Sequence, residues 1–157
     1  MDSDDAFKLI KAASTMGTGL MAGSAIYINL VEHPARMKID DVKSLHRQWK
    51  ESFDLAKIIM IGASLVPICG GIAAYAMNQS KGKPWLIAAG MLAFNVPYTA
   101  LVIMPRSIQP ISDYEVVARK DPAVVKETVD KWNTLHKVRT VVDLAAFAWC
   151  VYNLVYN

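Results

Sequence analysis

Four long stretches of this chain carry no charged side chain, and this pattern constrains the fold more than any other feature. Residues 12–31, 58–80 and 84–105 are uncharged over 20, 23 and 22 positions, and the 14 residues 144–157 are uncharged as well. About 20 predominantly apolar residues in a helix cross the ~30 Å hydrocarbon core of a bilayer. The first three stretches meet that length. The fourth meets it if the span takes Asp143 into the membrane.

The chain is therefore predicted to be all-α, an integral membrane four-helix bundle. The spans are expected at about residues 12–35, 57–78, 84–105 and 139–156, within a single domain over residues 1–157. The composition agrees with this prediction, because 54% of the residues are hydrophobic and only 20% are charged. Average soluble domains are roughly 25% charged.

The segments before the second and fourth spans are predicted to be helices that continue into those spans. Before the second span, apolar residues recur at intervals of three and four, at Val42, Leu45, Trp49 and Phe53. This is the spacing of one helix face, and Asp40 is placed to cap the start of the helix. Before the fourth span, Asp121 and Pro122 fit a cap followed by proline at the first helical position. Spans two and four are thus expected to extend outside the membrane.

Several functional classes find no support in the sequence. The net charge of +3 is too small to indicate a nucleic-acid partner, and no basic patch with interleaved aromatic residues occurs. Neither a glycine-rich phosphate loop nor a Gly-x-Ser-x-Gly motif is present. The three histidines lack metal-ligand spacing, so no metal is expected. A metal or haem held by ligands from separate helices is the minor alternative.

Polar residues that enter the fourth span share one helix face. They follow one another at steps of four, three and four: Trp132, His136, Arg139 and Asp143. A carboxylate at this depth costs about 2–3 kcal/mol on insertion scales. Asp143 is therefore expected to face the bundle and to pair with Arg139, Arg36 or Arg106. A structural salt bridge and a catalytic role are both open for this set.

A second set of polar residues lies on the first and third spans. Its members are Asn29, Glu32, His33 and Arg36 on the first span, with Asn95 and Tyr98 on the third, and Asn29, His33 and Arg36 share one helix face. Polar groups at membrane depth are costly unless they line a cavity or bond across helices. We expect His33, His136 and Arg139 to converge on one polar, aromatic-edged cavity. Such a cavity suits a lipophilic ligand with a few oxygens. The alternative is that these histidines simply mark helix ends at the membrane interface.

Three short motifs occur in order along the chain. They are Glu32-His33-Pro34-Ala35-Arg36, then Asn95-x-Pro97-Tyr98-Thr99 with Ile103-Met104-Pro105, and finally Trp132-x-x-x-His136-x-x-Arg139. In this order and spacing the chain resembles the anthrone oxygenase-like family of small four-span membrane proteins. The resemblance covers nearly the whole chain.

The resemblance implies a cofactor-independent oxygenase that oxidises an anthrone-like polycyclic phenol to an anthraquinone with molecular oxygen. His136 is then the first candidate for the base that takes a proton from the substrate, and His33 is the second. Arg139 is expected to hold the resulting anion. The implied substrate-binding residues are Asn29, Arg36, Asn95, Tyr98, Trp132, Asp143 and Trp49, with the two tryptophans stacking on a flat ring.

Two functions of other classes stay open. The chain could be a non-catalytic accessory subunit of a larger membrane complex, or a binder of a quinone- or sterol-like lipid. The expected partners are a lipophilic small molecule and the lipid bilayer, and no nucleic acid, with a homo-oligomer or a membrane-complex partner also open. The protein is expected to be a multi-pass membrane protein. The endoplasmic reticulum and mitochondrial membranes are both compatible with the sequence.

Overall fold

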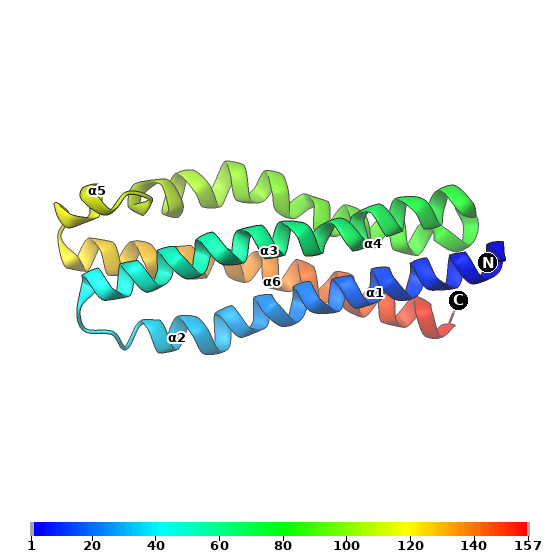
Figure 1. The fold of residues 1–157 in the computed structure, drawn as a ribbon, viewed down its shortest axis with the longest axis horizontal. Helices are drawn as coiled ribbons and strands as arrows, with labels where there is room; N and C mark the ends of the chain where they lie inside the picture. Colours follow the sequence, from blue (N-terminus) through cyan, green and yellow to red (C-terminus); the bar gives the residue numbers. More distant parts are fainter. Residues whose placement is uncertain (1, 157) are drawn as a thin grey trace.

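The structure, a computed structural model, describes residues 2–156. Its elements are α1 (Ser3–Tyr27), η1 (Ile28–Glu32), α2 (His33–Arg36), α3 (Val42–Met77), α4 (Gln79–Tyr98), η2 (Thr99–Ile108), η3 (Gln109–Ile111), α5 (Tyr114–Ala118) and α6 (Pro122–Tyr156). Both η1 and η2 are π-helical, and η3 is a short 3₁₀-helix. The long helices lie side by side and alternate in direction (Figure 1). This confirms the all-α bundle.

Three helical stretches are long and apolar enough to cross a membrane. They are α3, residues Gln79–Ile111 and α6, and they support a membrane protein. The first helix, α1, is not among them, since glycine, serine and threonine occupy much of its length. It nevertheless packs along α3 and α6 over much of the bundle (Figure 1). The expected count of four spans stays a prediction.

The helices before the second and fourth spans continue into them, as predicted. α3 runs unbroken for 36 residues and α6 for 35. The cap of α3 is Asp41 and not Asp40, because the side chain of Asp41 accepts the backbone N–H of Ser44 at 2.9 Å. Hydrogen bonds from the hydroxyl and the N–H of Ser44 lower the pKa of the Asp41 carboxyl. In α6, Asp121 accepts the N–H of Ala123 at 2.8 Å, which confirms the predicted cap.

The hairpin of α3 and α4 is held together at two glycines. A Cβ on Gly71 would lie 2.3 Å from the carbonyl oxygen of Trp85, and a Cβ on Gly82 would lie 2.2 Å from that of Ala74. No side chain fits at such distances, so the backbones of the two helices touch here. The close approach fixes α3 and α4 as antiparallel neighbours, as the short link between them predicts.

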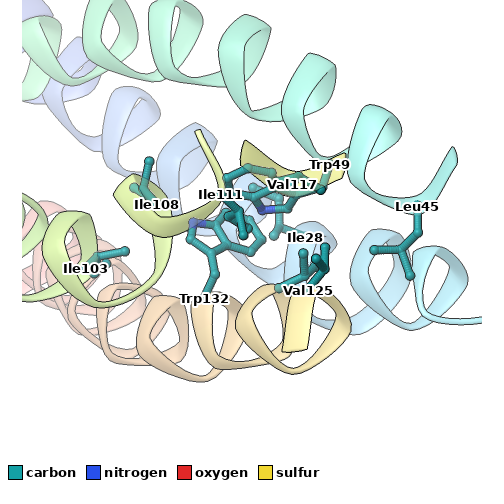
Figure 2. Packing of buried hydrophobic residues seen from close by; sticks show 10 residues of the cluster. Ile28, Leu45, Trp49, Ile103, Ile108, Ile111, Val117, Val125 and Trp132 are labelled. Atoms are coloured by element: carbon teal, nitrogen blue, oxygen red, sulfur yellow. The ribbon is translucent and has the colours of Figure 1, made fainter. Parts of the chain in front are cut away.

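Two buried apolar clusters hold the ends of the bundle. One gathers side chains from η1, α3, the segment from η2 to α5, and α6, including Leu45, Trp49, Val125 and Trp132 (Figure 2). The other lies toward the chain termini and is centred on Trp85. Both clusters are closely packed, and the cavity of the bundle lies between them.

Candidate functional site

A cavity of about 300 Å³ lies inside the bundle, enclosed by α1–η1, α3, α4–η2 and α6. Its walls are mostly apolar, with Phe53, Met60 and Ile103 among the lining side chains. The polar lining residues are Glu32, Ser52, Lys57, Ser64, Asn95, Thr99, His136 and Arg139. A largely apolar cavity with a few convergent polar groups is the usual form of a small-molecule site.

The two π-helical segments both contribute to the cavity wall. η1 supplies Ile28 and Glu32, and η2 supplies several residues, Ile103 among them. Pro105 lies within η2 and has no N–H, so one backbone hydrogen bond is lost there and a wider turn is favoured. π-helical turns occur frequently at functional sites, which agrees with the position of both segments.

The lining contains an imidazole and a guanidinium that lie one turn apart on α6. His136 is buried, and its ring centroid lies 5.3 Å from that of Trp132. Among the described residues, neither ring nitrogen of His136 has a hydrogen-bond partner, and Nδ1 is completely enclosed. Nε of Arg139 is likewise enclosed without a partner. Buried polar groups are nearly always satisfied, so these two side chains are exceptions within the lining of the cavity.

Asn95 and Asp143 meet at the deeper end of this group. The Asn95 amide Nδ2 donates to Asp143 Oδ1 at 2.6 Å. Asp143 is fully buried, so the prediction that it faces the bundle is confirmed. The predicted salt bridge with an arginine is not seen within residues 2–156, where the arginine–carboxylate pair that forms joins Arg36 to Glu32. Arg139 interacts with Asp143 only electrostatically, without a salt bridge. Asn95 faces Asp143 across the helix interface and satisfies Oδ1 of the carboxylate, whereas Oδ2 has no hydrogen-bond partner among the described residues.

The lining does not include His33, so the expected convergence of His33 and His136 on one cavity is not seen. His33 is buried, and its Nε2 lies 3.1 Å from Oδ1 of Asp130 on α6. Arg36 is also buried behind the wall, with its guanidinium 5.8 Å from the ring centroid of Trp132. The physical reason is rotation of the first helix. The helix face that carries Ile28 and Glu32 lines the cavity. The predicted face, which carries Asn29 and His33, begins one residue later and is turned away from the cavity.

Three further predicted residues lie beside the cavity and not in its lining. The Asn29 amide donates to the hydroxyl of Thr140, and the Tyr98 hydroxyl donates to the carbonyl oxygen of Leu135 at 3.2 Å. Trp49 packs in the buried cluster of Figure 2. These residues tie the first, second and third long helices to their neighbours, so in this structure they support the cavity walls.

Of the sequence-predicted residues, the structure therefore brings together His136, Arg139, Asn95 and Trp132 at the cavity. The sequence analysis counted Glu32 among the polar residues of the first span but not among the site residues, although it lines the cavity and accepts hydrogen bonds from Arg36 and Ser52. The available signal was its place four residues before Arg36, a spacing at which opposite charges pair on a helix.

Within residues 2–156, no group of three or more His, Cys, Asp or Glu side chains is placed to hold a metal ion. The cavity opens to the outside of the bundle between α3 and the α4–η2 helix. Ile61, Val96 and Met104 line the cavity and are also exposed on the outer surface. Because these outer faces are apolar, the opening suits a ligand that arrives from lipid.

The family model for anthrone oxygenases matches residues 49–149. The chain belongs to the anthrone oxygenase family. A curated relative, the anthrone oxygenase nsrD of Aspergillus novofumigatus (strain IBT 16806), is 26% identical over 141 residues, which cover 86% of each chain. No solved structure matches. Family membership supports an oxygenase-like function in general, and the matched segment contains Asn95, Trp132, His136 and Arg139.

Proposed function

We propose that this protein is a membrane-embedded oxygenase that oxidises an anthrone-like polycyclic phenol with molecular oxygen and needs neither metal nor flavin. The observation that carries the proposal is the unpartnered imidazole of His136 beside the guanidinium of Arg139 in a largely apolar cavity. This arrangement offers a base and a cation in surroundings that exclude bulk water. The family membership of the chain supports the reaction class.

His136 acts as the base in this proposal. The Nε2 atom of His136 has no hydrogen-bond partner among the described residues and is not enclosed by protein, so it is free to take the proton from the acidic methylene carbon of an anthrone. Arg139 and the amide of Asn95 stabilise the anion that forms, because its negative charge spreads onto the carbonyl oxygen of the anthrone. The ring systems of Trp132 and Phe53, both in the lining, hold the flat substrate.

The oxidation that follows is balanced by molecular oxygen alone. The carbanion gives up its electron pair to oxygen, and a carbon–oxygen bond forms as a peroxide. The imidazolium of His136 returns its proton to the peroxide. Loss of water, which takes the remaining hydrogen of the carbon, then leaves a carbonyl group where the methylene was. One oxygen atom thus ends in the quinone and the other in water, so the protein needs to supply only proton transfer and charge stabilisation.

The test is oxygen consumption by the purified protein in detergent with dithranol as substrate, after treatment with a chelator and with no flavin added. We expect uptake well above spontaneous oxidation, with one oxygen molecule consumed for each anthraquinone formed. A loss of activity on chelation would contradict cofactor independence. Uptake at the background rate, together with co-purification in a stoichiometric membrane complex, would favour the accessory-subunit function instead.

A further inference from the structure

The polar groups of the cavity lie at two levels along the bundle. Arg139 and Asn95 form the deeper level, and Glu32 with Ser52 forms the other. Glu32 lies near the level of Trp132, because its partner Arg36 packs against that ring. Trp132 and Arg139 are seven residues apart on α6, or about 10 Å at the rise of an α-helix. On α6 the wall between these two levels carries His136, about one turn from Trp132 and one turn from Arg139.

Only one of the two oxygens of the Glu32 carboxylate is held by hydrogen bonds to the described residues. Its Oε1 accepts from Nη2 of Arg36 and from the hydroxyl of Ser52. Among residues 2–156, its other oxygen has no hydrogen-bond partner, and it is not enclosed by protein. Since Glu32 lines the cavity, this second oxygen is an acceptor available to a ligand.

The support of this carboxylate is rigid. Arg36 is 2% exposed, its Nε donates to Gln48, and its guanidinium lies over the Trp132 ring. These contacts join α2, α3 and α6 around one side chain. A carboxylate that is held in this way keeps its direction, which makes it a selective acceptor for a hydroxyl group.

We infer that Glu32 is a substrate-binding residue that accepts a hydrogen bond from a ring hydroxyl, at the end of the substrate opposite the oxygen held by Arg139 and Asn95. This inference rests on the proposed function and names its substrate class more closely. The substrate is a fused-ring ketone that carries a hydroxyl remote from its carbonyl. A ring without that hydroxyl leaves the Glu32 carboxylate desolvated and unpaired, which lowers affinity.

The experiment compares the binding of 2-hydroxyanthraquinone and 2-methoxyanthraquinone to the full chain in nanodiscs, at a pH where the phenol is protonated. Neither probe can be oxidised further at the central ring, so binding is measured without turnover. The unaltered protein should bind the hydroxy compound about tenfold or more tightly. Glu32→Gln should remove most of that preference. The matched control is Glu51→Gln, an exposed carboxylate on α3 outside the lining, which should keep the preference.

Equal binding of the two probes by the unaltered protein would overturn the inference, as would a preference that survives in a folded Glu32→Gln variant. If Glu32→Gln does not fold, Glu32→Asp keeps the charge but withdraws the carboxylate from the cavity. It should reduce the preference, and an unchanged preference would again overturn the inference. Oxygen uptake with 2-hydroxyanthrone, an oxidisable probe that carries the hydroxyl, separates the two proposals. Turnover without hydroxyl preference refutes the role of Glu32 alone, whereas hydroxyl preference without turnover refutes the oxygenase alone.

Discussion

Asn95 donates a 2.6 Å hydrogen bond to the carboxylate of Asp143, and this bond joins α4 to α6 inside the bundle. Asp143 has no exposed surface, and a buried carboxylate is stable only where hydrogen bonds satisfy it. Asn95 also lines the cavity. The same hydrogen bond therefore stabilises the α4–α6 interface and positions the Asn95 amide, which we propose binds the substrate.

Asp143→Ala should lower the stability of the bundle by on the order of 1–3 kcal/mol, because it leaves the buried amide of Asn95 without its acceptor. Reversible unfolding in mixed micelles measures the change. Asp54→Ala is the matched control, since Asp54 is partly exposed, pairs with Lys50 and Lys57 of its own helix and should cost less. Equal losses in the two variants would argue against a special role for the buried bond.

His136→Gln should reduce kcat by about 100-fold or more, as expected for removal of a general base. His33→Gln should have a much smaller effect, because His33 lies behind the cavity wall and bonds to Asp130. Oxygen uptake with dithranol measures both variants, and their circular dichroism spectra check that the bundle remains folded. A larger loss in His33→Gln than in His136→Gln would reverse the order of the two candidate bases.

Ala100→Trp should block the opening between α3 and η2, because Ala100 lines the cavity and is exposed on its outer side. We expect kcat/KM to fall by about tenfold or more, since less substrate reaches the reacting groups. Its neighbour Leu101 is 74% exposed and lies outside the lining, so Leu101→Trp is the control. If the two variants are equally active, the substrate enters by another route.

Gly71→Ala should destabilise the α3–α4 hairpin by about 1–3 kcal/mol, because the new methyl group would overlap the carbonyl oxygen of Trp85. Gly62→Ala on the same helix meets no atom within 4 Å. It should be neutral or stabilising by up to ~1 kcal/mol, as alanine favours a helix over glycine. Thermal unfolding of both variants in the same detergent tests the contrast, and a stable Gly71→Ala would show that the helices can separate.

Local patterns in the sequence were sufficient for the helices. The uncharged stretches, the apolar spacing before α3 and the cap at Asp121 depend on near neighbours in the chain, and each appears in the structure. The cap of α3 was predicted one residue early, at Asp40 and not Asp41, because both are acidic and only the helix geometry distinguishes them.

The α6 part of the candidate site was also predictable. Trp132, His136 and Arg139 share a face by spacing alone, and the spacing of a regular helix is maintained through α6. The contribution of the first long helix was not predictable in the same way. The spacing of its polar residues shows which of them share a helix face. It does not show whether the face of His33 or the face of Glu32 is turned toward the cavity.

The sequence alone thus determined that this protein is a helical membrane bundle with a polar face on its last helix. Only the tertiary structure decided that Glu32 lies in the cavity, that His33 lies behind its wall and that Asn95 is the partner of Asp143. The physical reason is that helix formation depends on contacts within a few residues. The rotation of each helix and the choice of partners across the bundle depend on packing between residues far apart in the chain.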